Sequence, residues 1–505
     1  MRCIKTVGNC RMWAWFILLS ILISLLVALL SGILQCKGAI RADMPLDEFK
    51  AYMDEGIPAL MKLYRIPGCS IALVKEGEVV CTQAYGYADV ADGRALTVDT
   101  PMSVQSITKS VTAWGVMRLV EKGLIDLDRP VSQYLKSWQF PQSNDPAEKI
   151  TTRQLLSHTA GMPLGDFTNI YAPGGTMPSS RGVLTEEAVV TRKPGTGFAY
   201  SNVGYNLLEL LIEDVTGQSF SEYMRSEIFL PIGMESAAFD IDATTTPYPP
   251  TGYNLSGKPV PVYLYPSKAS GGLFATAHDI ARFAATSLRE NPVLGVESIE
   301  QMYQPESHKI GIYGLVFEAY GLGHYLETLP NGLRSISHGG QGNGIMTHFQ
   351  AVPETGDAIV ILTNSQRSWP FISHVLNAWA KWRSFPSVGM GRIICGHYGL
   401  CAVIGVMLSA SLLMVLRLPL AFRRQQRAGS RLLRVGTASI LLGILIWCVC
   451  QKYLFVTSVF PVLAKWLGGA VFVFSIALLL SALLPAIHLS HGRVKQKYRS
   501  LIFLL

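Results

Sequence analysis

Long apolar runs at both ends of the chain constrain its fold more than any other feature, because each is long enough to cross a bilayer. One uncharged run covers residues 12–34, and three more cover about 393–416, 435–455 and 466–489. Buried core helices are the alternative, but no acidic residue follows Asp357 and each run is longer than most core helices. The sequence therefore predicts one N-terminal and three C-terminal transmembrane helices.

Basic residues are distributed unevenly around these four runs. Three basic residues precede the first run, and two further groups of basic residues flank the C-terminal runs. The two groups are Arg417, Arg423, Arg424, Arg427, Arg431 and Arg434, and then Arg493, Lys495, Lys497 and Arg499. Because basic flanking segments stay in the cytoplasm, both chain ends and the arginine-rich loop are predicted to be cytoplasmic. Residues of about 44–391 then lie outside the cell membrane.

Three parts of the chain follow from this topology. Residues 1–43 are predicted to form a cytoplasmic start and an anchor, 44–391 an extracytoplasmic domain, and 392–505 three spans with an arginine-rich cytoplasmic loop. A cleaved signal peptide is the alternative for the first run. That run is long for a signal peptide, and no clean small-x-small cleavage site follows it.

The net charge of +8 does not extend to the middle of the chain. Residues 44–391 hold 34 acidic and 25 basic residues, so nucleic-acid binding by this domain has no electrostatic basis. Its two cysteines, Cys69 and Cys81, would be out of register by roughly three residues on a hairpin, which favours free thiols over a disulfide. We find neither zinc-ligand spacing nor a phosphate-binding loop, so no metal or other cofactor is expected.

Hydrophobic periodicity in the middle of the chain predicts an α/β domain. An amphipathic helix and two strands begin it, two further helices follow, and two strands and a closing helix end it. The expected elements are 46–64, 70–75, 79–87, 106–122, 204–215, 344–352, 358–363 and 369–382. We expect an antiparallel sheet flanked by terminal helices, with a helical subdomain inserted between 126 and 283 and an irregular surface loop at 244–265.

One pair of residues in this domain has the spacing of a catalytic pair. Ser106 and Lys109 form a Ser-x-x-Lys sequence at the start of a predicted helix, and positions i and i+3 share one helix face. A serine hydroxyl is a weak nucleophile at neutral pH and needs such a partner, and burial would lower the lysine pKa so that it acts as a base. The alternative is a Ser N-cap followed by an exposed Lys, because two fixed positions recur by chance.

Two later motifs change that balance. The sequence Pro-Gly-Thr-Gly-Phe-Ala-Tyr-Ser-Asn ends at Asn202, and Ser-His-Gly-Gly-Gln ends at Gln341. With these motifs the chain resembles the class C β-lactamases, DD-peptidases and related esterases, in which Ser-x-x-Lys, Tyr-x-Asn and Lys-Thr-Gly or His-x-Gly occur in this order. Segments 155–163 and 270–276 also resemble structural signatures of that family, and the resemblance covers about residues 48–385. It implies a β-lactamase-like fold.

The resemblance implies a catalytic role for three residues. Ser106 would form an acyl-enzyme, Lys109 would accept or hold its proton, and Tyr200 would pass that proton to the leaving group. A core aromatic is the alternative for Tyr200. His158, in one of the structural signatures, is interpreted as structural.

The same resemblance implies substrate contacts for five residues. Asn202 would bond the substrate amide, and His338 would replace the lysine of the third motif. Gly339 and Gly340 would let the substrate backbone approach a strand closely. The backbone N–H groups of the nucleophile and of Gln341 would form an oxyanion hole. A helix cap is the alternative for Asn202, and a satisfied strand histidine is the alternative for His338.

The predicted function is hydrolysis of amide bonds, and of ester bonds as a further option, in peptides or peptide-like small molecules that contain D-amino acids. A histidine is only partly charged near neutral pH, so the loss of the third-motif lysine disfavours β-lactam hydrolysis. The membrane layout also resembles that of prodrug-activating peptidases, which remove an acylated D-amino-acid leader. The alternatives are a β-lactamase or esterase of the same family and a penicillin-binding sensor without turnover.

Overall fold

The computed structural model describes residues 2–30, 40–143, 145–166, 168–418, 428–451 and 454–502. It divides into two compact units. One unit is Gly38–Arg392, and the other combines Met1–Lys37 with Ile393–Leu505.

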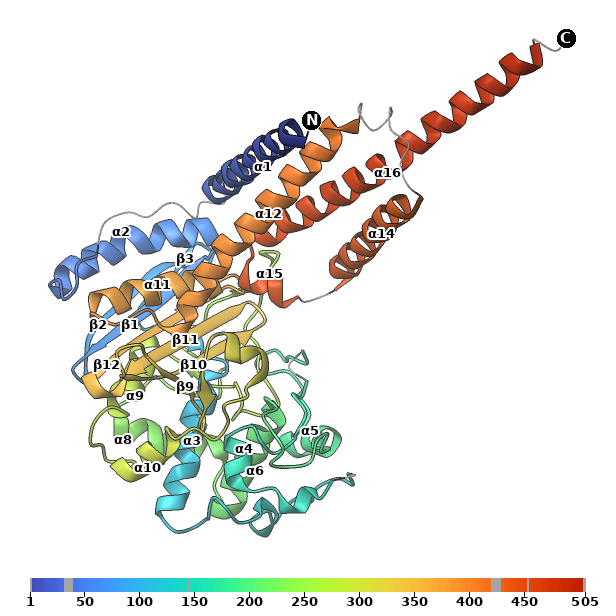
Figure 1. The fold of residues 1–505 in the computed structure, drawn as a ribbon. Helices are drawn as coiled ribbons and strands as arrows, with labels where there is room; N and C mark the ends of the chain where they lie inside the picture. The colour runs from blue at the N-terminus through green and yellow to red at the C-terminus, as the bar shows by residue number, and fades with distance from the viewer. Residues whose placement is uncertain are drawn as a thin grey trace. The chain divides into compact units, whose positions relative to one another are not determined.

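An eight-stranded sheet forms the centre of the Gly38–Arg392 unit, and all of its neighbouring strands pair antiparallel (Figure 1). The spatial order is β3-β2-β1-β12-β11-β10-β9-β8. The strands are β1 (Gly68–Lys75), β2 (Glu78–Asp89), β3 (Arg94–Ala95), β8 (Ala319–Tyr320), β9 (Tyr325–Thr328), β10 (Arg334–Gly342), β11 (Ile345–Val352) and β12 (Asp357–Thr363). The first and last long strands of the domain, β1 and β12, are therefore direct neighbours, and the predicted α/β class with an antiparallel sheet is confirmed.

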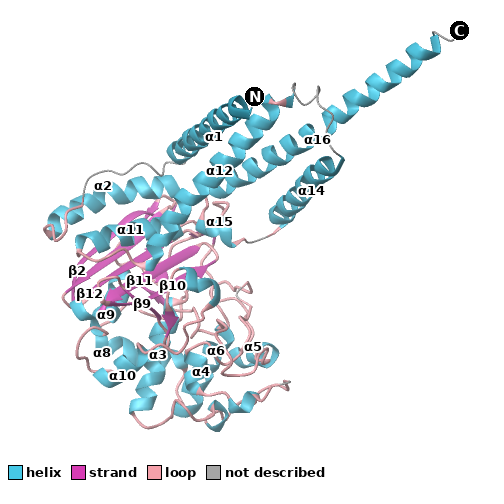
Figure 2. Ribbon diagram, in the orientation of Figure 1, coloured by secondary structure: helices cyan, strands magenta, loops and turns pink. Residues whose placement is uncertain are grey.

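Helices cover both faces of this sheet, as the burial of almost every residue in β1, β11 and β12 requires (Figure 2). Helices α2 (Leu46–Tyr64) and α11 (Trp369–Trp382) pack together on one face, where Phe49 stacks on Trp382 with ring centroids 4.4 Å apart. Helices α3 (Ile107–Glu121) and α9 (Ala277–Thr286) pack against the strands from the other face. Both helices of the first face have the bounds that the sequence predicts.

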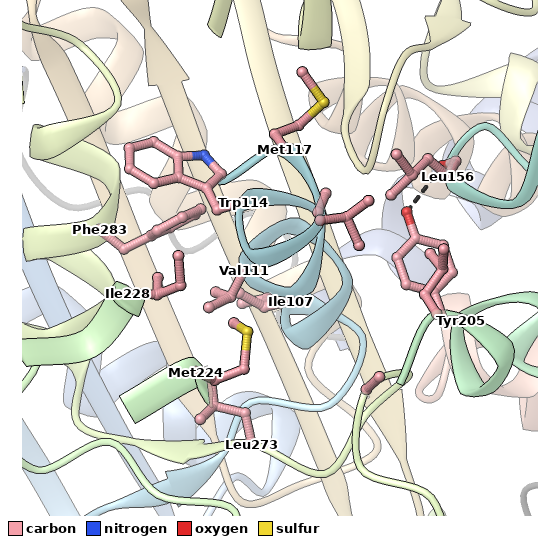
Figure 3. Close-up of a cluster of buried hydrophobic side chains, with 14 of the residues drawn as sticks. Ile107, Val111, Trp114, Met117, Leu156, Tyr205, Met224, Ile228, Leu273 and Phe283 are labelled. Atoms are coloured by element: carbon pink, nitrogen blue, oxygen red, sulfur yellow. Dashed lines mark hydrogen bonds between the residues drawn. The ribbon is translucent and has the colours of Figure 1, made fainter. Parts of the chain in front are cut away.

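Helix α3 runs through the core and is buried on nearly every side. In Figure 3, Trp114 and Phe283 lie on one side of it, and Tyr205 and Leu156 lie on another. A helix that is buried on nearly every side must be enclosed by other elements, and α3 is enclosed by the sheet and by the helical subdomain. This burial fixes the position of the helix that begins at the candidate nucleophile.

The helical subdomain lies between α3 and α9. Its helices are α4 (Thr152–Leu156), α5 (Ser180–Glu187), α6 (Asn202–Thr216), α7 (Phe220–Met224) and α8 (Leu230–Ile232), with the 3-10 turns η1 (Val131–Gln133) and η2 (Ala147–Lys149) and the π-helical turn η3 (Arg225–Phe229). Helix α9 packs on β1 and β12, so the insertion ends before Ala277 and not at residue 283. The domain continues through α10 (Val296–Met302), η4 (Gly311–Leu315), η5 (Pro353–Thr355) and η6 (Gly389–Gly391).

The segment 244–265 is less exposed than a surface loop. It contains a small pair of strands, β5 (Gly252–Tyr253) and β6 (Pro259–Val260), and the side chains of Tyr253 and Tyr263 are buried. Another short pair, β4 (Met102–Ser103) and β7 (Phe274–Ala275), links the start of α3 to the segment before α9. Tyr253 and Tyr263 are therefore enclosed by the protein, whereas Tyr248 of the same segment is exposed.

The hairpin of β1 and β2 confirms the prediction for the two cysteines. Cys69 pairs with Tyr85 and Cys81 pairs with Leu73, so the two thiols belong to different rungs of the ladder and both are free. The turn between the strands uses Glu76 and Gly77, both with positive φ.

The other unit consists of apolar helices. They are α1 (Arg2–Leu30), α12 (Arg392–Leu416), α14 (Ala428–Cys450), α15 (Phe455–Val459) and α16 (Leu463–Ile502). By length and composition, three described segments are suited to crossing a membrane, namely Gly389–Leu416, Ser430–Cys450 and Leu463–Leu483. They confirm three apolar C-terminal helices of spanning length at the predicted places, the second of which ends at Cys450 and not near residue 455.

The apolar part of α1 that the structure describes, Trp15–Leu30, is shorter than those three segments, and residues 31–34 of the predicted run lie outside the described residues. Within this unit, α1 packs on α12 so closely that a Cβ at Gly405 would overlap Ser24. Arg423, Arg424 and Arg427 of the predicted cytoplasmic loop also lie outside the described residues.

Candidate active site

Ser106 lies at the N-cap of α3, directly after a residue with strained backbone. That residue, Gln105, has φ +53°, which non-glycine residues seldom adopt. Its amide nitrogen donates to Ser103 Oγ at 2.8 Å and to Tyr263 Oη at 3.2 Å, and its amide oxygen accepts from Tyr265. The surrounding side chains therefore hold the turn that presents the Ser106 hydroxyl, which is part-buried.

The side chain of Lys109 is fully buried one turn further along α3. Its Nζ lies 3.3 Å from Ser106 Oγ and donates to Asn202 Oδ1 at 2.7 Å and to the Ser270 carbonyl oxygen at 2.6 Å. It also lies 4.9 Å from the ring centroid of Tyr200. Burial lowers the pKa of Lys109 well below its usual value, because removal from water disfavours the ammonium form and no carboxylate hydrogen-bonds to it among the described residues.

Tyr200 and Asn202 lie at the start of α6, where the N-cap is Ser201 and not Asn202. The Ser201 hydroxyl accepts from the Gly204 N–H at 2.9 Å and donates to the Pro163 carbonyl at 2.6 Å. This cap fixes the turn, so Asn202 is free to face Lys109. Burial raises the pKa of Tyr200 well above its usual value, and a hydrogen bond with Ser106 partly offsets that shift.

His158 packs against the turn that contains Tyr200 and hydrogen-bonds to its backbone. Its Nδ1 accepts from the Ser201 N–H at 3.1 Å, its carbonyl accepts from the Ala199 N–H at 2.7 Å, and its ring lies 4.2 Å from that of Tyr200. Burial lowers the pKa of His158, with smaller contributions from Lys109 and His338, so a neutral imidazole fills this position. These contacts agree with a structural role for His158.

His338 lies inside the protein, on β10. Its Nε2 is 3.2 Å from the Tyr320 hydroxyl, and its Nδ1 is 2.9 Å from the Gly339 carbonyl oxygen. Burial lowers the pKa of His338 well below its usual value, and the nearby Lys109 adds to the shift. Each ring nitrogen thus has a hydrogen-bond partner, and His338 is a buried, neutral group. The centroid of its ring lies 5.1 Å from that of Tyr325.

The two glycines after His338 make room for the protein's own atoms. A Cβ at Gly339 would lie 2.9 Å from the Trp369 ring. A Cβ at Gly340 would overlap Thr347 Oγ1 and the Val104 carbonyl oxygen, and would lie 2.8 Å from Gln105 Cβ. Strand β10 therefore lies directly against the residues that precede the nucleophile. Next on the strand, the Gln341 amide oxygen accepts from Trp369 Nε1 at 3.2 Å.

The site also depends on residues that the sequence did not single out. Glu209, buried on α6, accepts from the backbone N–H groups of both Lys268 and Ala269, the latter at 2.9 Å. These bonds fix the segment whose next carbonyl, that of Ser270, accepts from Lys109. Burial raises the pKa of Glu209 to about 7. A signal was present, because Glu209 is an acid in the middle of the apolar stretch of α6.

An aromatic wall flanks the candidate catalytic residues. Tyr313, on η4, lies 5.5 Å from Tyr200 and 5.5 Å from Tyr325 between ring centroids. Phe198 and Tyr320 continue the same cluster, 5.6 Å apart. Tyr313 comes from the short helix η4, and Tyr320 and Tyr325 come from the short strands β8 and β9, elements that were not predicted from the sequence.

The chain matches the profile of the beta-lactamase family over residues 53–377, which is more than half of its length. It therefore belongs to the beta-lactamase family. This membership supports serine hydrolase or peptidase activity in general, and the predicted resemblance is confirmed.

Individual relatives agree with this assignment. Protein flp of Staphylococcus aureus (strain N315) is 26% identical over 411 residues, covering 79% of this chain and 80% of that protein. The putative penicillin-binding protein PbpX of Bacillus subtilis (strain 168) is 28% identical over 298 residues, covering 57% and 68%. Among solved structures, the octameric penicillin-binding protein homologue from Pyrococcus abyssi has a TM-score of 0.57 at 27% identity, covering 68% of this chain and 79% of that chain.

The match to Protein flp also bears on the apolar ends. The Gly38–Arg392 unit makes up about 70% of the chain, less than the 79% that the match covers. The similarity therefore includes part of the other unit.

Proposed function

We propose that the chain is a membrane-anchored serine hydrolase that cleaves amide bonds, and also ester bonds, in peptides containing D-amino acids. Ser106 would carry the acyl group, Lys109 would be the base, and Tyr200 would relay the proton. The observation that carries this proposal is the buried amine of Lys109, which lies 2.6, 2.7 and 3.3 Å from three oxygen atoms.

Counting hydrogens on that amine supports its role as a base. A neutral amine has two N–H bonds and one lone pair. The Ser270 carbonyl and the Asn202 amide oxygen accept the two N–H groups, which leaves the lone pair to accept from the Ser106 hydroxyl. Burial favours this neutral form. As Ser106 Oγ attacks the substrate carbonyl carbon, its proton passes to Lys109.

Tyr200 suits the relay better than the role of base. Its raised pKa keeps the phenol protonated at neutral pH, so it has a proton to donate. In the proposed sequence the phenol protonates the leaving nitrogen as the C–N bond breaks, and regains a proton from Lys109. Water then attacks the acyl-enzyme, its proton follows the same route in reverse, and Ser106 is regenerated.

Binding groups around the nucleophile follow from the same arrangement. The N–H groups of Ser106 and Gln341 are proposed as the oxyanion hole, and the packing of β10 against Val104 and Gln105 supports this. Asn202 accepts from Lys109 through Oδ1, which leaves its amide nitrogen as a donor for the substrate. The buried, neutral state of His338 gives it no charge for a substrate carboxylate, which supports amides and esters over β-lactams.

The membrane arrangement is part of the proposal. Three helices suited to crossing a bilayer follow the hydrolase unit. With the arginine-rich loop in the cytoplasm, the hydrolase unit would lie on the outside. An acylated D-amino-acid leader of a secreted peptide is one specific substrate that fits this layout.

The test uses the full chain in lipid vesicles and a fluorescent fluorophosphonate. We expect one labelled serine, identified as Ser106 by peptide mapping, and no label on the Ser106→Ala variant. An N-acyl-D-aminoacyl amide should be hydrolysed faster than its L enantiomer. Folded chain that takes no label would overturn the proposal. A stable acyl-enzyme that releases no product would instead indicate a sensor.

A further inference from the structure

An exposed apolar surface lies on η4, the short helix that carries Tyr313. Ile312 is 52% exposed and Leu315 is 66% exposed, the largest exposure of any large apolar side chain described in the hydrolase unit. Two exposed cationic residues lie near them: Lys309 precedes η4 in the sequence, and Arg392 hydrogen-bonds to the Leu315 backbone. We call Lys309, Ile312, Leu315 and Arg392 the η4 patch. Apolar side chains with a cationic rim are typical of surfaces that bind a membrane or a partner.

The η4 patch is fastened to the segment through which the chain leaves the hydrolase unit. Arg392 Nη1 donates to the Leu315 carbonyl oxygen at 3.3 Å. The backbone of η6 lies so close that a Cβ at Gly389 would overlap the Val316 carbonyl oxygen. Glu327, on β9, also accepts a hydrogen bond from the Gly389 backbone. These contacts all lie within the Gly38–Arg392 unit.

That exit segment is also the start of an apolar span. The segment suited to crossing a membrane begins at Gly389, and α12 begins at Arg392. Wherever α12 enters a bilayer, Leu315 is one hydrogen bond away from its first residue. An arginine at the end of a span extends its charge to the lipid headgroups while its stem stays in apolar surroundings.

We propose that the η4 patch rests on the bilayer surface, with Ile312 and Leu315 inserted at the boundary between headgroups and acyl chains. This inference rests on the proposed insertion of α12. Chain continuity selects lipid over a separate protein as the occupant, because the residue after Arg392 already belongs to the span. Tyr313 belongs to η4, like Ile312 and Leu315, and its ring contacts that of Tyr200. One wall of the candidate active site would then lie at the membrane surface.

The test is photo-crosslinking of the full chain in phosphatidylcholine vesicles, with a phosphatidylcholine that carries a diazirine near the glycerol end of its acyl chain. Peptide mapping should find label both in α12 and in 309–317. Label in α12 but none in 309–317 overturns the inference. An unlabelled α12 overturns the proposed anchoring and this inference with it, whereas fluorophosphonate labelling of Ser106 reports on the catalytic proposal separately.

A matched pair of variants tests the patch itself. Ile312→Asp with Leu315→Asp should lower labelling of 309–317 by roughly tenfold, because an acid at this depth opposes insertion. Leu124→Asp removes an exposed leucine that follows the C-terminal end of α3, and it should leave the labelling of 309–317 unchanged. Equal labelling of all three proteins would overturn the inference. So would labelling that disappears as more protein is added per vesicle, because that result indicates a second copy on the patch.

Discussion

The ε-amino nitrogen of Lys109 lies 3.3 Å from the hydroxyl oxygen of Ser106, and Ser106 is the N-cap of the buried helix α3 whose first turn contains Lys109. No charged partner compensates this lysine among the described hydrogen bonds and ion pairs. An uncompensated buried lysine is costly to a fold, so its retention beside a serine indicates a chemical use.

Replacing Lys109 by methionine should abolish most of the reactivity of Ser106. Loss of a general base lowers the rate by about 10²- to 10⁴-fold, and we expect fluorophosphonate labelling to slow by that factor. Lys122→Met is the matched control, because Lys122 follows the same helix and its ion pair with Glu227 lies at the surface. Labelling of Lys109→Met at the wild-type rate would show that Lys109 is not the base.

The same substitution should change how stability depends on pH. Between the lowered pKa of folded Lys109 and its ordinary value, the unfolded chain binds a proton that the folded chain does not. Wild-type stability therefore rises with pH across this window, whereas methionine contributes no such rise. The stability of Lys109→Met relative to wild type should therefore decline as pH rises through this window towards about pH 10. Thermal unfolding of both proteins across this range measures it, and a difference that stays constant with pH would contradict it.

Much of the hydrolase fold follows from local sequence. Helices α2 and α11 have the predicted bounds because each combines one apolar face with clear ends. The order of the sheet does not follow in this way. That β1 pairs with β12, almost 300 residues away, depends on long-range packing that no local period encodes. Short strands such as β4 and β8 have two residues each and too little pattern to detect.

In the candidate site, too, some contacts follow from local sequence and others depend on the tertiary fold. Ser106 and Lys109 are three apart on a helix, so their contact follows from spacing alone. The contacts of Lys109 with Asn202 and with the Ser270 carbonyl join segments 93 and 161 residues distant and require the tertiary fold. The burial of His338 also requires the tertiary fold, because Tyr320 and Tyr325, which contact its ring, come from other strands of the sheet.

We expect Glu209 to affect the reaction by holding the backbone of Lys268 and Ala269 in place, and not by contacting the substrate. Glu209→Ala would leave the buried N–H groups of Lys268 and Ala269 without an acceptor, which costs of order 3 kcal/mol of stability and frees the Ser270 carbonyl to move. Acylation of Ser106 should slow accordingly. Glu209→Gln keeps an oxygen acceptor and should retain most of the activity. Equal loss of activity in the two variants would contradict a role in positioning.

The Gln variant also isolates the titration of this carboxyl group. The pKa of Glu209 is raised to about 7, so below that pH the folded chain binds a proton that the unfolded chain releases above its ordinary pKa near 4.5. Wild-type stability should fall relative to that of Glu209→Gln as pH rises from about 5 to 7, and chemical denaturation at several pH values would measure it.

A pair of glycine substitutions separates close packing from general helix and strand preferences. At Gly340 a Cβ would overlap Thr347 Oγ1 and the Val104 carbonyl oxygen, so Gly340→Ala must push β10 away from the turn that presents Ser106. Overpacking of this kind costs about 1–3 kcal/mol, and the nucleophile should lose reactivity as its turn shifts.

Gly56, inside α2, provides the control. An added methyl group there would have no neighbouring atom within 4 Å, and the backbone has no positive φ. Gly56→Ala should therefore raise stability by up to about 1 kcal/mol, since alanine favours the helix, and should leave labelling of Ser106 unchanged. Denaturant unfolding and fluorophosphonate labelling of both variants test the contrast, and a stable, fully reactive Gly340→Ala would show that β10 does not hold the nucleophile turn.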